Sequence, residues 1–405
     1  MYHRALKVRI YPNEQQAIQL SQVMGCCRWW YNYALNMCNE TYKETGKGLN
    51  QSALNKFLPE LKKQEETEWL VDCYSQCLQA VTLNLTKAFK NFFEKRAKYP
   101  RFKSKHKKQS CQYPQNVKIV DSHLKIPKIG LVKAKIHRLF EGKIKTVTLV
   151  KHSSGKYYAS ILFETEDELP KPILTGKICG IDLGIKEFAI VNDGEKTSKY
   201  ANPRFIKKHE KNKRRKQQKL ARKQKGSKSR EKAKRLVAKV HEKCSNARQD
   251  YLHKLSRKIV NDNQVVVVEK LNVKGMNRNH CLAKAITDVS WGMFVNFLDY
   301  KLKEKGGLLI EIDRWFPSSK TCSNCLYQME KMPLEIREWT CPSCGKVHDR
   351  DENASINIRE EGIRLINTDG LAVSAMGGTV RPKGGRKSVL RQEPVNVEAP
   401  TIPQG

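Results

Sequence analysis

The chain has 405 residues, which is long enough for two or three domains with a sizeable core. Its 77 Lys and Arg residues stand against 41 Asp and Glu residues and give a formal net charge of +36. A globular protein this basic repels itself unless a polyanion is nearby, so a nucleic-acid partner is expected. No segment approaches the roughly 20 apolar residues that span a bilayer, and the N-terminus lacks the apolar core of a signal peptide. A cytoplasmic protein without a membrane partner is therefore expected.

The first half of the chain changes twice between strand and helix patterns. Residues 1–12 alternate apolar and polar side chains and predict a strand. Over residues 13–110, apolar residues recur every three or four positions up to a basic linker, which predicts a helical domain capped by Asn13. Residues 115–168 return to strand patterns, with a turn at Gly155. We expect a barrel-like β-rich domain formed by 1–12 and 115–168, with the helical domain inserted between them.

The second half predicts an α/β domain over residues 171–376. "KICGIDLGIKEFAIVNDGEKTSKY" predicts two strands joined by a tight turn, and "QVVVVEKLN" is typical of a strand buried on both faces. Between Lys207 and Leu236, 16 Lys and Arg residues stand against two Glu in a long helical pattern. Helix, strand and helix patterns follow. Residues 377–405 have little to bury and are expected to be disordered.

Four cysteines have the spacing of a metal site. Cys322, Cys325, Cys341 and Cys344 form two CxxC pairs with 15 residues between them, a pattern that suits a tetrahedral zinc ion. His348 could replace one ligand, but four thiolates already complete the set. A closed site of this kind is structural, because it leaves no open coordination position, and it lets a loop-rich insert fold without a core of its own. The nine other cysteines are interpreted as small buried apolar side chains.

Acids placed where a charge costs stability are the candidates for chemistry. Asp182 lies in the apolar pattern "ICGIDLGI", and Glu269 ends the buried run "VVVV". Pairing of Asp182 with a lysine, or exposure of Glu269 to solvent, are the open alternatives. In "HDRDENASINI", helical periodicity favours Asp351, without excluding Asp349 as a helix cap or Glu352; an exposed acid at a helix N-terminus is the alternative for Asp351. Converging carboxylates would suit two magnesium ions for phosphodiester cleavage.

Together these motifs resemble the TnpB family, the RNA-guided nucleases encoded by insertion sequences and related to compact type V CRISPR effectors. The resemblance rests on "GIDLG", "VVEKLN", "FPSSKTCSNC", "CPSCG" and "HDRDENASINI" and extends to "YPRFK", "QDYLHKLS" and "WGMF". It implies an RNase H-like, RuvC-type nuclease domain over 171–376 with a zinc ribbon inserted at 316–348. By motif, the catalytic and Mg²⁺-binding triad is then Asp182, Glu269 and Asp351. Ser355 and Leu326 are mild departures from the family pattern, and neither is expected to be a ligand.

The resemblance also implies the partners. A guide RNA from the protein's own locus would direct cleavage of double-stranded DNA beside a short flanking motif, which a wedge-type domain (1–12 and 115–168) and a helical recognition domain (13–110) would read. The candidate nucleic-acid contacts are Arg28, Gln79, Lys207, Lys208, Lys213, Arg214, Arg215 and Lys216. The alternatives are a solvated helix face for the basic stretch, an ordinary polar role for Gln79, and core packing for the aromatic residues that surround Arg28.

A monomeric ribonucleoprotein associated with a bacterial nucleoid is the expected form. Two other functions stay open. A DNA transposase could use the same acids for strand transfer, and a guide-dependent regulator could bind DNA without cutting it. Loss of an acid of the triad would indicate the regulator, and all three acids are present.

Overall fold

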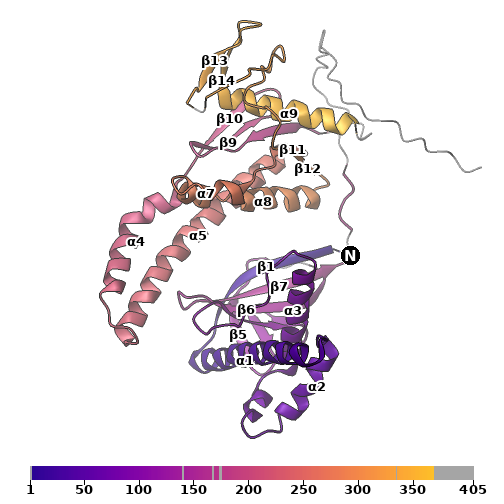
Figure 1. Cartoon of the computed structure of the whole chain (residues 1–405), viewed down its shortest axis with the longest axis vertical. Coiled ribbons are helices and arrows are strands. Elements are labelled where there is room, and N and C mark those ends of the chain that lie inside the picture. The colour runs from indigo at the N-terminus through magenta and orange to yellow at the C-terminus, as the bar shows by residue number, and fades with distance from the viewer. Residues whose placement is uncertain (1, 139–140, 167, 173–175, 334, 369–405) are drawn as a thin grey trace, which may run out of the picture.

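The computed structural model describes residues 2–138, 141–166, 168–172, 176–333 and 335–368. These residues form two lobes, visible in Figure 1, which we call the N-terminal lobe (2–166) and the C-terminal lobe (176–368). None of the helices in these ranges combines the length and the apolar character that a membrane-spanning segment needs. The predicted disordered segment 377–405 lies outside the described residues.

The N-terminal lobe contains one sheet of seven strands in the order β2-β6-β7-β1-β5-β4-β3. The strands are β1 (Tyr2–Tyr11), β2 (Gln109–Tyr113), β3 (Lys118–Val120), β4 (His123–Ile126), β5 (Gly130–Lys135), β6 (Lys143–Lys151) and β7 (Tyr157–Thr165). Strand β1 lies in the middle and runs antiparallel to both β7 and β5. The edge strands β2 and β3 do not pair with each other in the described part of the chain, so hydrogen bonds do not close the expected barrel.

Helices fill the stretch between β1 and β2, as the apolar spacing predicts. They are α1 (Glu14–Thr45), α2 (Gln51–Leu61), the short 3₁₀ helix η1 (Glu68–Asp72) and α3 (Ser75–Phe93). Asn13 caps α1 by accepting a hydrogen bond from the N–H of Gln16 at 2.8 Å, and Gly46 ends the helix with φ of 67°. The last of these helices ends at Phe93, before the basic linker, and strand β2 begins at Gln109 near the end of the segment 13–110.

The C-terminal lobe is built on a sheet with the strand order β10-β9-β8-β11-β12. The strands are β8 (Ile178–Asp182), β9 (Glu187–Asn192), β10 (Thr197–Ala201), β11 (Val265–Glu269) and β12 (Leu308–Ile312). Strands β8, β11 and β12 are parallel, whereas β9 and β10 are antiparallel. The stretch expected to form two strands therefore forms three.

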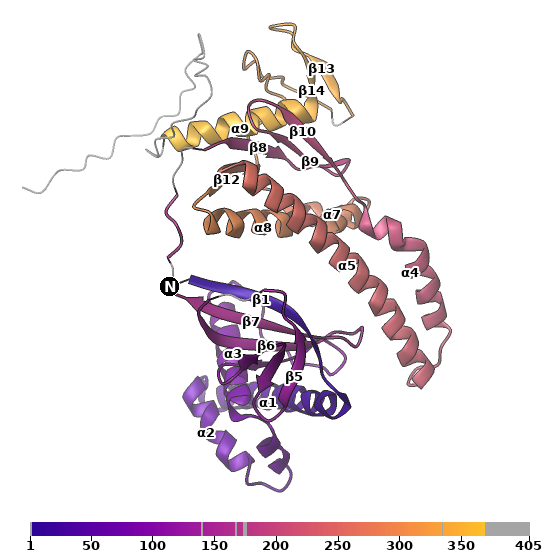
Figure 2. The same ribbon diagram turned by 180° about the vertical axis from the view of Figure 1, so that it is seen from behind.

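Helices cover both faces of this sheet (Figures 1 and 2). The helices of this lobe are α4 (Phe205–Ala221), α5 (Lys228–Asp262), α6 (Val273–Met276), α7 (Ala283–Val289), α8 (Trp291–Glu304) and α9 (Arg350–Thr368). One face packs on α5 and α8 through Cys179, Ile181 and the alternate valines of β11. The other face packs on α9 through Ile178 and Ile358. Because successive side chains of a strand point to opposite faces, Gly180 and Asp182 lie on the α9 face with Ile178.

Helix α9 approaches the sheet unusually closely. A Cβ atom at Gly180 would lie 2.2 Å from the carbonyl oxygen of Ser355 and 2.5 Å from the backbone nitrogen of Arg359. At Gly362, on the helix itself, a Cβ atom would lie 2.3 Å from a methyl carbon of Val267. One glycine on each partner therefore sets the distance between α9 and the two central strands.

Helices α4 and α5 form a hairpin that extends beside the N-terminal lobe (Figures 1 and 2). The basic helical pattern is interrupted at Gly226, which has φ of 88°, and Ser227 then caps α5. Glu242 of α5 is buried and joins the lobes: its carboxylate accepts a hydrogen bond from the Tyr158 hydroxyl at 2.8 Å and pairs with Lys156 Nζ at 2.8 Å.

A small insert separates β12 from α9. It contains a bridge between Thr321 and Gln328 and a two-stranded sheet of β13 (Glu338–Thr340) and β14 (Val347–Asp349). Its own buried apolar cluster contains only Cys322, Trp339 and Cys341 among the described residues. The insert is therefore too small to hold its shape by apolar burial alone.

Substituting Gly180 tests the close approach of α9. Gly180→Ala should lower the free energy of unfolding by roughly 1–3 kcal/mol, because the added methyl group meets backbone atoms that cannot rotate away. Gly292→Ala is the matched control: it lies in α8 with nothing within 4 Å of the new carbon and should change stability by about 1 kcal/mol or less, in the stabilising direction. Urea unfolding followed by circular dichroism measures both. Equal stability of the two variants would contradict the close packing.

Candidate functional site

Two acids stand side by side at the carboxyl edge of the C-terminal sheet. Asp182 ends β8 and Glu269 ends β11. The residues before them, Ile181 and Val268, are partners in the parallel register, so the two acids occupy corresponding positions. Both lie on the face that α9 covers, because they share it with Gly180 and the alternate valines of β11. Ligand sites of parallel sheets commonly lie at this edge.

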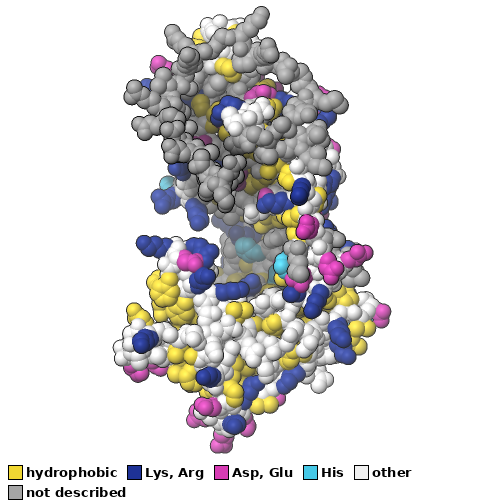
Figure 3. Space-filling model, turned by 90° about the vertical axis from the view of Figure 1, so that its right-hand side faces the viewer, with side chains coloured by type: hydrophobic (Ala, Val, Ile, Leu, Met, Phe, Trp, Pro, Cys, Tyr) yellow, Lys and Arg dark blue, Asp and Glu magenta, His cyan; other side chains and the backbone are white. Residues whose placement is uncertain are grey.

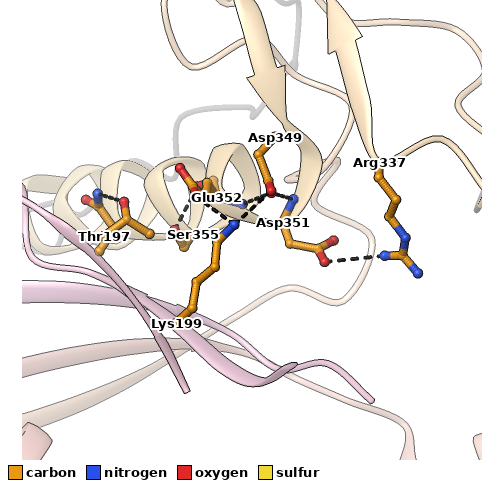
Figure 4. Close-up of polar contacts among 8 residues, drawn as sticks. Thr197, Lys199, Arg337, Asp349, Asp351, Glu352 and Ser355 are labelled. Atoms are coloured by element: carbon orange, nitrogen blue, oxygen red, sulfur yellow. Dashed lines mark hydrogen bonds and ion pairs between the residues drawn. The ribbon is translucent and has the colours of Figure 1, made fainter. Parts of the chain in front are cut away.

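A third group of acids lies at the start of α9, and Asp351 of this group is near Asp182. Figure 4 shows that these acids contact different cationic partners. Asp349 caps the helix, since its Oδ1 accepts hydrogen bonds from the N–H groups of Asp351 and Glu352, both at 3.0 Å. Lys199 Nζ on β10 pairs with Asp349 at 2.9 Å and with Glu352 at 2.8 Å. Asp351 points away from that lysine and pairs with Arg337 Nη1 of the insert at 3.3 Å.

Asp182 is buried and lies within the electrostatic influence of Glu269 and Asp351. Burial raises the pKa of Asp182, and the nearby carboxylates of Glu269 and Asp351 raise it further, to about 7. Burial also raises the pKa of Glu269, although a hydrogen bond from the Ser318 hydroxyl opposes this shift. A set of oxygen ligands whose charges oppose one another fits divalent cations such as Mg²⁺, which would relieve that repulsion.

Lys199 gives Asp349 a different electrostatic character. Burial alone would raise the pKa of Asp349, but hydrogen bonds from the Glu352 N–H and from Lys199 outweigh it and hold the pKa below its ordinary value. The hydrogen bonds to Glu352 and Asp349 in turn raise the pKa of Lys199. Asp349 and Glu352 therefore share Lys199 as a cationic partner, and Asp349 stabilises the N-terminus of α9 as its cap.

The four predicted zinc ligands converge. The sulfur atoms of Cys322, Cys325, Cys341 and Cys344 all lie within 4.8 Å of one another, and among the described residues they are the one group of three or more His, Cys, Asp or Glu side chains that gathers so closely. The Cys322–Cys344 and Cys325–Cys341 sulfur pairs are 3.7 and 3.6 Å apart, near the edge of about 3.8 Å expected for a tetrahedron with Zn–S bonds of about 2.3 Å. The cluster therefore fits a structural zinc ion.

His348 lies beside this cluster and outside it. Its Nε2 atom is 3.1 Å from the sulfur of Cys322, and the side chain is buried against Trp339. An imidazole in this position can hydrogen-bond a thiolate ligand and orient it, which agrees with a set of four sulfur ligands.

Hydrogen bonds connect the cysteine insert to the acids. Asn353 and Asn357, one turn apart on α9 and both buried, donate to the carbonyl oxygen of Thr321 at 2.7 and 2.6 Å. Asn357 also donates to the carbonyl oxygen of Ser318 at 2.7 Å. The Ser318 hydroxyl in turn donates to Glu269. The first cysteine knuckle is thus held between the helix that carries Asp351 and the strand that carries Glu269.

The predicted nucleic-acid contacts lie away from this edge. No residue of α4 is fully buried. The six candidate contacts on this helix are exposed or half-buried: Lys207, Lys208, Lys213, Arg214, Arg215 and Lys216. Gln79 is exposed on α3. Arg28 is half-buried on α1 and donates to the side-chain oxygen of Gln109 at 2.6 Å, whereas its neighbour Trp30 is buried as a core residue.

Several residues of the site escape sequence patterns. Lys199 and Arg337 are single cations among 77 Lys and Arg residues, and nothing local distinguishes them. Ser318 lies in "FPSSK", where its role depends on a strand 49 residues earlier. Asn353 and Asn357 have a weak signal, since two asparagines four residues apart share one face of a helix.

Three family models match separate parts of the chain. A model described as "Probable transposase" (OrfB of IS605) matches residues 160–280, and a model described as "Cas12f1-like, TNB domain" matches residues 291–358. A third, described as a helix-turn-helix domain, matches residues 1–47. In this structure the last range forms strand β1 and the single long helix α1.

The chain is similar over nearly its whole length to two bacterial proteins. A "Putative RNA-guided DNA endonuclease" of Streptomyces pristinaespiralis is 39% identical over 98% of this chain and 97% of that protein. The "Putative RNA-guided DNA endonuclease InsQ" of Escherichia coli K12 is 31% identical over 97% of this chain and 98% of that protein.

One solved structure shares the fold at low sequence identity. A cryo-EM structure of a Cas12f1–sgRNA–target DNA complex superposes with a TM-score of 0.54 and 12% identity, over 88% of this chain and 98% of that chain. The likeness agrees with the predicted α/β multidomain class.

The raised pKa of Asp182 predicts a pH-dependent gain in stability when its charge is removed. An acid with a folded-state pKa of about 7 and an ordinary value of 3.8 opposes folding increasingly as the pH rises from about 4 to about 7. Asp182→Asn should therefore raise the free energy of unfolding of the metal-free protein by on the order of 2 kcal/mol at about pH 8, and by less at about pH 5. Urea unfolding in the presence of a chelator measures this difference.

The matched control for that prediction is Asp250→Asn. Asp250 is exposed, and within the described residues its one ion pair is with Lys254, at 2.8 Å on the same helix, so its replacement should change stability little at either pH. A gain for Asp182→Asn that is independent of pH, or no gain, would show that the repulsion at this edge is weak.

Proposed function

This chain belongs to the TnpB family, the OrfB proteins of IS605-type insertion sequences, and from that premise we propose that it is an RNA-guided DNA endonuclease. The observation that supports the proposal is that Asp182 and Glu269 end neighbouring parallel strands at one edge of the C-terminal sheet. Asp351, in the first turn of α9, lies near enough for its charge to raise the pKa of Asp182. Acids from two central strands and one helix are the arrangement implied by an RNase H-like, RuvC-type nuclease domain. We assign that domain to residues 171–376, with the zinc ribbon at 316–348.

In this proposal Asp182, Glu269 and Asp351 hold two Mg²⁺ ions. Bound there, the ions would supply a water activated for attack and would neutralise charge on the leaving oxygen. The chain's own residues prepare the site. Asp351 is presented by the first turn of α9, where the helix dipole favours negative charge. Ser318 orients Glu269 through its hydroxyl, and Lys199 draws Asp349 and Glu352 away from the site.

The proposed partners are a guide RNA from the protein's own locus and matching double-stranded DNA beside a short flanking motif. The net charge of +36 and the exposed basic residues of the α4–α5 hairpin support them, since phosphate contacts supply affinity that is independent of sequence. On the face drawn in Figure 3, Lys and Arg side chains gather at the level where the two lobes meet. We assign the wedge-type role to 1–12 and 115–168, and the recognition role to 13–110, in a monomeric, nucleoid-associated particle.

Cleavage by variants of the three acids tests the proposal. With its copurified RNA and Mg²⁺, the protein should cut DNA that matches the guide, and Asp182→Ala or Asp351→Asn should slow cutting by roughly 100-fold or more. Glu352→Gln, one position from Asp351, should stay close to the wild type because it removes only an exposed ion pair to Lys199. A plasmid cleavage time course measures all of them.

Two results of the same assay would favour other functions. Strand transfer of transposon ends without RNA would support a transposase, the description attached to the family model over 160–280. Guide-dependent binding of DNA without any cutting under Mg²⁺ would support a regulator. Full activity of Asp182→Ala would reject the assigned site.

Removing the zinc ligand Cys341 should separate cleavage from RNA binding. The insert is hydrogen-bonded to Asn357 of α9, and its Ser318 hydroxyl donates to Glu269. Cys341→Ser should therefore reduce cleavage at least about tenfold while RNA affinity changes little. Cys281→Ser, at an exposed cysteine outside the cluster, is the control. Filter binding and cleavage of the same preparations give the comparison. Equal loss of both activities would mean that the insert only maintains the fold.

A further inference from the structure

A second candidate site lies in the N-terminal lobe. A cavity of about 470 Å³ opens between α1, α3, the strands β2 and β6 and the loop 101–108, in the lobe that does not carry the three acids. Five cationic side chains line it, and no Asp or Glu does: Arg28, Arg101, Lys103, Lys107 and Lys108. We propose that this cavity binds an unpaired nucleotide of a nucleic-acid strand, with its phosphate among the cations and its base on the apolar wall. This deepens the proposed function and rests on it.

The charge of the cavity calls for an anionic ligand. Within the described ranges, none of the five cations forms an ion pair with a carboxylate. Like charges held this close repel one another, and a phosphate is the anion that Lys and Arg side chains most readily bind in nucleic acids. Arg28 is half-buried, and an unpaired charge costs more stability there than on the open surface.

The rim of the cavity is held in place by polar contacts. Asn32 of α1 donates to the carbonyl oxygen of Lys103 at 2.9 Å and accepts from its N–H at 2.7 Å. The Gln109 side chain donates to the carbonyl oxygens of Ser104 and Lys107 at 3.2 and 2.9 Å and accepts from Arg28. These bonds fix the loop 101–108 against α1, so the cations are arranged before a ligand arrives.

The wall of the cavity suits a nucleobase. Met24, Cys27 and Val81 form a buried apolar surface. Phe102 lies at the same cavity with 55% of its surface exposed, as a ring available for stacking. The Asn84 amide donates to Gln112 at 2.8 Å, and both side chains line the cavity, where they could bond the edge of a base. The volume falls within the range of about 300–1,000 Å³ common for small-molecule sites.

The first test removes three exposed cations from the cavity. The triple variant Arg101→Ala, Lys107→Ala, Lys108→Ala is compared with Lys43→Ala, Lys56→Ala, Lys63→Ala, which removes the same charge from exposed positions of the same lobe. The probes are a fluorescein-labelled oligouridylate and oligothymidylate, titrated into the full-length protein freed of its RNA. The cavity variant should bind at least one probe roughly tenfold or more weakly than the control variant, with a shallower dependence on salt. Equal affinities of the two variants would overturn the proposal.

The second test distinguishes a base pocket from a general basic surface. Phe102→Ala should weaken binding by roughly fivefold to 100-fold, the range for one stacked base, whereas Phe102→Trp should restore it. Phe93→Ala, at a ring that is 72% exposed elsewhere in the lobe, should have no effect. Photocrosslinking with 4-thiouridine or 4-thiothymidine, followed by mass spectrometry, should label the peptide that contains Phe102, and the stronger probe identifies RNA or DNA as the ligand. Crosslinks confined to other peptides would reject the cavity.

These measurements use binding alone, so they separate the two proposals. If the cavity binds the probe but the protein does not cut guide-matched DNA, the endonuclease proposal is rejected and the cavity proposal is supported. Guide-dependent cleavage by the wild type, together with equal probe affinities of the cavity variant and the control variant, would support the endonuclease proposal and reject the cavity proposal.

Discussion

The close contact between helix α9 and strand β8 is the constraint on which the candidate site depends. With a side chain at residue 180, the helix backbone could not lie where it does, since a Cβ atom there would overlap the carbonyl oxygen of Ser355. That contact delivers Asp351 to the edge where Asp182 and Glu269 end their strands. The resulting repulsion between carboxylates is an intrinsic cost of the fold, and it is the feature that makes the edge suitable for cations.

The cysteine insert also links helix α9 to strand β11, because it contacts both elements. It follows β12, the neighbour of the strand that carries Glu269, and ends at α9. Its polar contacts to Asn353 and Asn357 are buried, so they are sensitive to small displacements. A metal that orders the insert would therefore also order the approach of the acids, although none of its ligands reaches them.

Local patterns predicted the parts of this structure that depend on local physics. The run "VVVV" indicates a buried central strand, and the spacing of Cys322, Cys325, Cys341 and Cys344 indicates a closed ligand set that the folded chain does assemble. The sequence pattern could not distinguish the environments of Asp349, Asp351 and Glu352. Lys199, which forms ion pairs with Asp349 and Glu352, lies on a strand about 150 residues earlier. The cavity beside Arg28 was equally hidden, since it forms from two helices, two strands and a loop that are distant in the sequence.

The place of β1 in its sheet has a consequence for biosynthesis. This strand is synthesised well before its partner β7, which pairs Tyr2 with Thr165 and Ile10 with Tyr157. At roughly 5–20 residues per second, about ten seconds or more pass before the partner leaves the ribosome, and the strand must wait with its hydrogen-bonding groups unpaired. Lys7 and Arg9 alternate with apolar residues on this strand, and their positive charges disfavour pairing with the same strand of a neighbouring nascent chain before β7 is available.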